Sequence, residues 1–216
     1  MVMIVGVDDA GKGPVIGPMV IAGVLVDDKD IPKLKNLGVA DSKSLTPKQR
    51  EFLYDKIIEI VKKHEIILIP PFEIDEAVFS ETTNLNWLEG EKMVKIINHL
   101  RSQKAIVDCP SPNIKKFSDF LNERIKVKTE LICDHRAERF LPVAAASIIA
   151  KVTRDREIEK IKKKIKIDFN SGYPSDPKTQ EFLKKHYKDY PDIIRKSWDS
   201  YKRLIETKKQ KRIGEF

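Results

Sequence analysis

The N-terminal stretch of the chain is an apolar run that ends in two adjacent carboxylates and a glycine-rich turn. Residues 2–8 have the length and composition of a β-strand, Asp8 and Asp9 end it, and Gly11 and Gly13 follow. Two neighbouring acids on a buried strand repel each other and lose hydration unless a cation or several donors compensate. The pattern therefore favours a binding site at the strand end over a solvated surface turn.

The same residues must be tested against a phosphate-binding P-loop, because Gly6 to Lys12 fits G-x-x-x-x-G-K. Gly13 stands where that motif needs a serine or threonine, and two prolines in the next five residues oppose the helix that would follow. Asp8 and Asp9 would also place negative charge against a phosphate. We therefore expect no P-loop here.

Strand and helix patterns alternate along the rest of the chain. Thr46 reads as a helix N-cap, with Pro47 at the first helical position and Gln49 completing a capping box. A strand at 19–26 is expected to pair antiparallel with the first. Further strands are expected at 65–70, 104–108 and 129–133, and further helices at 84–100, 113–124, 144–165 and 178–188. The last two of these strands and the helix between them predict a parallel βαβ unit.

Two stretches carry no such pattern. Residues 27–43 read as a polar loop, and the segment after about residue 206 reads as mobile or dependent on a partner.

Composition limits the class of protein. Lysine and arginine outnumber the acids by 41 to 33, giving a net charge of +8 that suits a polyanionic partner. The two cysteines, Cys109 and Cys133, lack C-x-x-C spacing, so neither a zinc site nor a disulfide framework is indicated. No signal peptide or membrane-spanning run is evident, so we expect a cytoplasmic protein without a membrane partner.

Acidic side chains follow three of the expected strands. Asp8 and Asp9 end the first strand, Asp108 ends the strand at 104–108, and Glu138 follows the last strand. In an α/β sheet, sites form beyond the ends of neighbouring strands. Carboxylates without histidine or cysteine partners favour Mg²⁺ or Mn²⁺, and two such ions about 4 Å apart promote phosphodiester cleavage. Taken singly, Asp108 could equally be a turn residue, and Glu138 a solvated acid at a helix start.

Five motifs are distributed over nearly the whole chain. They are residues 6–18, Asp41-Ser42-Lys43, residues 144–151, Arg154-Asp155 and residues 171–177. Together and in this order they resemble archaeal type 2 ribonuclease H, ribonuclease HII. The resemblance implies an α/β fold with an RNase H-like mixed five-stranded sheet flanked by helices. It also implies a catalytic domain over residues 1–170 and a C-terminal helical substrate-binding extension over residues 171–216.

The activity implied by this resemblance is that of an endonuclease dependent on Mg²⁺ or Mn²⁺. It would hydrolyse the RNA strand of RNA/DNA hybrids and cut at ribonucleotides embedded in duplex DNA, leaving 5′-phosphate and 3′-hydroxyl ends. A non-catalytic nucleic-acid-binding relative is the alternative. We also expect a monomer, with the C-terminus as the binding site for a replication factor.

The resemblance assigns roles residue by residue. The catalytic, metal-binding acids fall on Asp8, Asp9, Asp108 and Glu138. The substrate-binding positions fall on Gly11, Lys12, Gly13, Ser42, Lys43, Lys151, Tyr173, Arg195, Lys196 and Ser197. Within that set, backbone groups of the glycine turn would read the ribose 2′-hydroxyl, and Tyr173 would stack near the sugar instead of serving as a core aromatic.

Three positions depart from the pattern of ribonuclease HII. Asp9 stands where that pattern has glutamate, Glu138 where it has aspartate, and Lys12 where it has arginine. We hypothesise that the two acid exchanges compensate each other, keeping the charge while altering rate or metal preference. Lys12 keeps a positive charge without the planar guanidinium fork.

Overall fold

The computed structural model describes residues 2–39 and 45–213, with side chains to Thr207, so the predicted substrate-binding residues Ser42 and Lys43 lie outside the described part. The chain divides into two compact units. The sheet unit comprises Met1–Ala10, Val20–Leu68 and Leu85–Arg154, and the C-terminal unit comprises Gly11–Met19, Ile69–Asn84 and Asp155–Phe216. The expected division of function at residue 170 stays a prediction.

The sheet unit is built on a mixed five-stranded sheet. Its strands are β1 (Met3–Ala10), β2 (Met19–Asp27), β3 (Lys63–Ile69), β4 (Lys104–Asp108) and β5 (Glu130–Asp134), in the order β3-β2-β1-β4-β5. β1 pairs antiparallel with β2 and parallel with β4, and β4 pairs parallel with β5. This arrangement confirms the predicted RNase H-like sheet and its βαβ unit.

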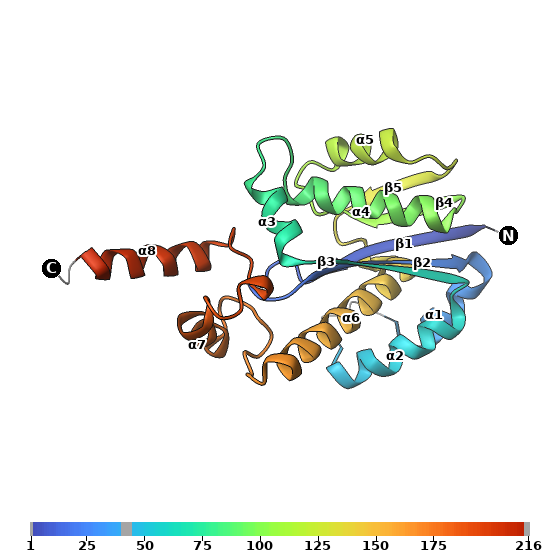
Figure 1. The fold of residues 1–216 in the computed structure, drawn as a ribbon. Helices are drawn as coiled ribbons and strands as arrows, with labels where there is room; N and C mark the ends of the chain where they lie inside the picture. Colours follow the sequence, from blue (N-terminus) through green and yellow to red (C-terminus); the bar gives the residue numbers. More distant parts are fainter. Residues whose placement is uncertain (1, 40–44, 214–216) are drawn as a thin grey trace. The chain divides into compact units, whose positions relative to one another are not determined.

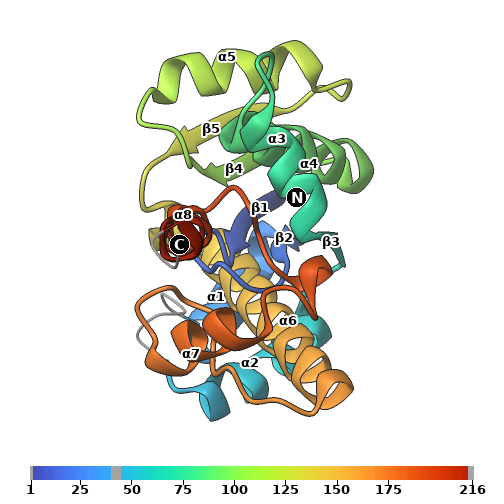
Figure 2. The ribbon, with the colours of Figure 1, turned by 60° about the vertical axis from the view of Figure 1, so that its left-hand side comes forward.

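Helices cover both faces of this sheet. They are α1 (Ile31–Asn36), α2 (Pro47–Ile60), α4 (Leu85–Leu100), α5 (Ile114–Arg124) and the first part of α6 (Leu141–Ile165). Figures 1 and 2 show α4 and α5 on one face, with α1, α2 and α6 on the other. The capping box of α2 is present as predicted, since Thr46 N donates to Gln49 Oε1 at 2.8 Å and Gln49 N to Thr46 Oγ1 at 3.3 Å.

The core of the sheet unit explains why β2 is apolar from Met19 to Val26. Every residue of β2 is buried, and Val24 on this strand belongs to a cluster with Leu53 and Ile57 of α2 and Ile149 of α6. Burial of apolar surface contributes about 25 cal/mol for each Å² removed from water, so this cluster is a main source of the unit's stability.

Gly6 allows α6 to approach the sheet. A Cβ atom on Gly6 would lie 2.2 Å from the carbonyl carbon of Pro142, which real Cβ atoms do not tolerate. A larger residue at position 6 would therefore push the start of α6 away from β1. The missing side chain at Gly6 thus lets α6 approach the strand that carries Asp8 and Asp9.

The C-terminal unit contains α3 (Pro71–Phe79), α7 (Pro177–His186) and α8 (Asp199–Ile213), with the second part of α6. An antiparallel bridge between Ile16 and Ile194 joins the residues after the glycine turn to the segment before α8. Both residues are buried in a core cluster with Phe169 and Phe182. The glycine turn and the segment before α8 are therefore parts of one packed structure.

Three stretches differ from the sequence-based expectation. Residues 27–43 are not simply a loop, because a 3-10 turn at Asp28–Asp30 is capped by Asp27 and leads into α1. α3 was not expected after strand β3, although Pro71 at the first helical position favours a helix start. α8 continues to Ile213, although the sequence after about residue 206 carries no helical pattern. That this segment is mobile or dependent on a partner stays a prediction. Among the described residues, no helix combines the length and apolarity needed to cross a membrane.

Candidate active site

Asp8, Asp9 and Asp108 come close together at the ends of β1 and β4. The Asp8 side chain is 4% exposed. Its burial raises the pKa of the Asp8 carboxyl well above the usual range, and the charges of Asp9 and Asp108 raise it further. The structure thus places two of the predicted catalytic acids, Asp9 and Asp108, close enough to act electrostatically on a third, Asp8.

Two donors oppose the rise in the pKa of Asp8. The backbone N–H of Asp9 donates to Asp8 Oδ1 at 2.7 Å, and the hydroxyl of Ser147 on α6 donates to the same carboxylate. Both lower the pKa of Asp8 without outweighing burial and like charge. Sequence reasoning missed Ser147, although a lone hydroxyl in the apolar run Val143–Ala150 is the kind of signal that could have identified it.

Glu138 lies on a short turn that is tied to Asp108. This turn, η3 (Ala137–Arg139), begins with Ala137, whose N–H donates to Asp108 Oδ1 at 2.7 Å. Glu138 is partly buried, next in sequence to that hydrogen bond. The structure therefore links the fourth predicted acid to the third through one backbone contact.

A fifth acid stands beside this group. Asp134 on β5 is in register with Asp108 on β4, and it is ion-paired with Arg139. Arg139 therefore offsets the charge of Asp134.

Carboxylate oxygens at this site suit a hard divalent cation such as Mg²⁺ or Mn²⁺. The raised pKa of Asp8 shows that burial and like charge disfavour its ionised form, a cost that a bound cation would relieve. Within residues 2–39 and 45–213, no three His, Cys, Asp or Glu side chains are already arranged as metal ligands. The fit to a divalent cation therefore rests on the donor chemistry and electrostatics of the acids.

Lys151 follows Ser147 by one helical turn on α6. Residues four apart in a helix share a face, so Lys151 lies on the side of α6 that presents Ser147 to Asp8. Its predicted substrate contact stays a prediction.

The glycine turn belongs to the C-terminal unit. β1 stays paired with β2 through Ala10, so the residues from Gly6 onward form a strand and not a P-loop. Gly11 has φ of +85°, a conformation that favours glycine. A Cβ atom on Gly13 would lie 3.3 Å from Cε1 of Tyr173, and Tyr173 is 39% exposed. The structure thus brings the predicted turn and the predicted tyrosine together.

The segment at Arg195–Ser197 has mixed surroundings. Arg195 is fully buried and its guanidinium donates to backbone carbonyls, while Ser197 donates its hydroxyl to Asp75 at 2.6 Å. Lys196 is exposed. Lys196 alone of the three thus has an exposed side chain, and the substrate contacts predicted for all three stay predictions.

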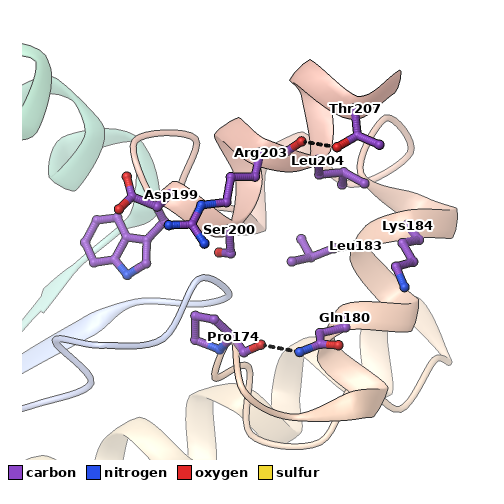
Figure 3. A pocket seen from close by; sticks show the side chains of 10 residues that line it. Pro174, Gln180, Leu183, Lys184, Asp199, Ser200, Arg203, Leu204 and Thr207 are labelled. Atoms are coloured by element: carbon purple, nitrogen blue, oxygen red, sulfur yellow. Dashed lines mark hydrogen bonds between the residues drawn. The ribbon is translucent and has the colours of Figure 1, made fainter. Parts of the chain in front are cut away.

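A cavity of about 610 Å³ lies between α7 and α8 in the C-terminal unit (Figure 3). Gln180 donates to the carbonyl of Pro174 at 2.9 Å on one side of it. Lys184, Asp199 and Arg203 supply its charged lining. The cavity lining has both positive and negative side chains, whereas the strand ends of the sheet unit carry the cluster of acids that a divalent metal prefers. We therefore assign the catalytic chemistry to the acids of the sheet unit.

A family model and a curated relative both match most of the chain. Residues 5–201 match the family model described as Ribonuclease HII. Ribonuclease HII of Pyrococcus horikoshii is 46% identical over 209 residues, which cover 94% of this chain and 93% of that protein.

Solved structures resemble the chain as well. The ribonuclease H2 structure from Pyrococcus horikoshii OT3 has a TM-score of 0.86 at 44% identity, covering 95% of this chain and 98% of that one. The RNase HII of a PCNA:RNase HII complex from Archaeoglobus fulgidus has a TM-score of 0.82 at 40% identity, covering 91% and 95%. Bst-RNase HIII in complex with Mn²⁺ shares the fold, with a TM-score of 0.78 at 21% identity over 97% and 71%.

Proposed function

The chain belongs to the ribonuclease HII family and is an endoribonuclease that cleaves RNA in RNA/DNA hybrids and at ribonucleotides embedded in DNA, and we propose that four acids at its strand ends form the catalytic centre. These acids are Asp8, Asp9, Asp108 and Glu138. The observation that carries the proposal is the buried Asp8 carboxyl, whose pKa is raised by burial and by two neighbouring carboxylates.

We assign metal binding to the same acids. The family uses divalent metal ions, and oxygen-only ligands favour Mg²⁺ or Mn²⁺. A bound ion of this kind supplies activation of a water molecule and stabilisation of the charge that develops on the phosphate. Asp8 is held for this role by the Asp9 N–H and the Ser147 hydroxyl, both of which favour its ionised form. Cleavage would leave 5′-phosphate and 3′-hydroxyl ends.

Recognition of the ribonucleotide is assigned to the glycine turn and Tyr173. Backbone groups of Gly11–Gly13 would bind the ribose 2′-hydroxyl, because residues without side chains allow close approach of the backbone. The exposed Tyr173 ring beside Gly13 would stack on the sugar. Lys12, Lys151 and Lys196 would neutralise phosphate groups, which makes binding sensitive to salt.

A replication clamp is the protein partner that we propose. The Archaeoglobus fulgidus relative has been solved in a complex with PCNA. After Ile205, the sequence of this chain is polar and mostly basic apart from Ile213, Gly214 and Phe216. We assign clamp binding to the two larger apolar side chains, Ile213 and Phe216. Replacing both by alanine should abolish clamp binding while leaving cleavage of a short duplex intact.

The catalytic assignment is tested with a duplex that carries one ribonucleotide. The wild-type chain should cut it with Mg²⁺ or Mn²⁺ and not with EDTA, and Asp8→Asn should still bind the duplex without cutting it. Cleavage by Asp8→Asn at the wild-type rate would remove Asp8 from the catalytic centre.

A further inference from the structure

Three consecutive carbonyls of the glycine turn accept hydrogen bonds from one segment of the chain. Arg195 Nη2 donates to Gly11 O at 2.7 Å, and Arg195 Nη1 donates to Lys12 O at 2.8 Å. Trp198 Nε1 donates to Gly13 O at 2.9 Å. The third donor of Arg195, Nε, reaches Gly17 O at 3.1 Å. The turn is therefore held along one side by Arg195 and Trp198.

The direction of the N–H groups of the turn follows from the direction of its carbonyls. In a trans peptide the C=O and the following N–H point in opposite directions, and the chain has no cis peptide bonds among the described residues. Because the carbonyls of Gly11 and Lys12 point at Arg195, the N–H groups of Lys12 and Gly13 point away from it. These are the backbone donors that a sugar hydroxyl approaching from the opposite side would meet.

Arg195 is itself rigidly placed. Its side chain is fully buried, and its guanidinium carbon lies 4.8 Å from the centre of the Trp198 ring. The backbone N–H of Arg195 donates to Val15 O at 2.8 Å, next to the bridge between Ile16 and Ile194. A buried guanidinium bonded to three carbonyls has few alternative positions, so it fixes the turn more firmly than a flexible surface side chain would.

Asp75 on α3 anchors the residues between Arg195 and Trp198. The Asp75 side chain is 9% exposed. Its Oδ2 accepts from Lys196 N at 2.8 Å, and its Oδ1 accepts from Ser197 N at 2.9 Å and from Ser197 Oγ at 2.6 Å. One carboxylate thus fixes two successive backbone amides and a hydroxyl. A continuous set of hydrogen bonds connects α3 to the glycine turn.

From these contacts we infer that Arg195, Trp198 and Asp75 are positioning residues for recognition of the ribonucleotide. They act through the turn. Arg195 sets the direction of the Lys12 and Gly13 N–H groups. Trp198 holds the same turn at the Gly13 carbonyl, because the next residue, Pro14, has no N–H to direct. The inference rests on the proposed function, in which Gly11–Gly13 contact the ribose. It gives the buried Arg195 and Ser197 an indirect role in binding, while the exposed Lys196 keeps its expected contact with the substrate.

Trp198→Phe provides the sharpest test, because it removes the indole donor and keeps an aromatic ring over Arg195. The measured quantity is ribonucleotide selectivity, the ratio of Ki for an all-DNA duplex to KM for the same duplex with one ribonucleotide. Selectivity should fall about threefold to tenfold, the effect of one hydrogen bond, with Ki unchanged. Trp87→Phe is the matched control, because Trp87 is the second tryptophan of the chain and lies in the sheet unit, whereas the glycine turn belongs to the C-terminal unit. This variant should leave selectivity at the wild-type value.

Asp75→Asn extends the test to the anchor. If Asp75 acts through the same turn, the double variant Asp75→Asn/Trp198→Phe should lose less selectivity than the product of the two single fold-losses. Multiplicative effects would contradict a shared route, as would equal rises in KM and Ki, which indicate a general loss of structure.

The outcomes separate this inference from the proposed function. A wild-type chain that cuts no ribonucleotide-containing duplex with either metal would overturn the proposed function itself. A wild-type chain that cuts and prefers the ribonucleotide duplex, together with unchanged selectivity in Trp198→Phe, would overturn the positioning role alone.

Discussion

The backbone N–H of Ala137 donates to Oδ1 of Asp108 at 2.7 Å, and this bond ties the turn that carries Glu138 to the end of β4. The position of Glu138 therefore depends on a backbone contact as well as on its own side chain. A change in length at position 138 would move the carboxylate while the turn stays in place, which makes the two acid exchanges of this chain testable.

The first prediction concerns these exchanges. Asp9→Glu and Glu138→Asp should each lower kcat/KM, by up to about a hundredfold, because small displacements at a reacting centre are costly. The double variant should recover most of the loss and show a changed ratio of Mg²⁺ to Mn²⁺ activity. A double variant whose losses multiply would contradict compensation, and one with unchanged activity in both metals would contradict tuning of the site by these residues.

Ser147→Ala should shift the acid limb of the pH–rate profile. The Ser147 hydroxyl lowers the pKa of Asp8, so its removal raises that pKa and moves the acid limb to higher pH. Activity near neutral pH should fall about tenfold, as expected for a lost hydrogen bond to a charged group. Ser102→Ala is the control, since Ser102 is also buried and donates to Lys104 O at 2.8 Å, at the opposite end of β4. An unshifted limb in Ser147→Ala would contradict the assignment.

Asp8→Asn should stabilise the metal-free protein at neutral pH. The pKa of Asp8 is raised in the folded state, so its ionisation favours unfolding as pH rises through the folded-state pKa. The advantage of the variant should therefore vanish in acid, where the wild-type aspartate is protonated in both the folded and the unfolded state. Added Mn²⁺ should raise the melting temperature of the wild type and not of Asp8→Asn. Equal melting temperatures at every pH and metal concentration would contradict the raised pKa.

Asp30 should show the opposite dependence on pH. Ion pairs with Lys33 at 2.8 Å and Lys62 at 3.0 Å hold the pKa of Asp30 at about 2. Its stabilising effect is present above the ordinary aspartate pKa of about 4 and is lost as pH falls toward 2. Asp30→Asn should thus lower the free energy of unfolding at pH 7, and this difference from the wild type should shrink as pH falls through about 2. Asp55→Asn, at an exposed aspartate on α2, serves as the control.

Much of the fold could be predicted because local signals agreed with tertiary packing. The capping box at Thr46 and the apolar run of β2 each specify one element, and both are present. The sequence does not predict α3, because Pro70 and Pro71 after a strand pattern indicate the end of that strand, although Pro71 also suits a helix start. A residue pattern that is compatible with two kinds of local structure, such as these prolines, therefore does not identify the element that forms.

The candidate site was predicted less completely than the fold. Strand ends located Asp8 and Asp108, and the resemblance supplied roles for the acids. Composition does not say whether a given guanidinium is buried, so the carbonyl contacts of Arg195 could not be predicted from its charge. Asp75 lies more than a hundred residues from Ser197 in sequence, and no local pattern connects such partners.

The measurement that tests the central claim most directly compares Asp108→Asn with Asp134→Asn. The two acids are in register on neighbouring strands, but only Asp108 is assigned to the catalytic centre, while Asp134 is paired with Arg139. On a duplex with one ribonucleotide, Asp108→Asn should lose at least about a thousandfold in kcat with Mg²⁺ and with Mn²⁺, while Asp134→Asn should stay within about threefold of wild type. Equal losses in the two variants, or wild-type cleavage by Asp108→Asn, would contradict the assignment of the catalytic centre.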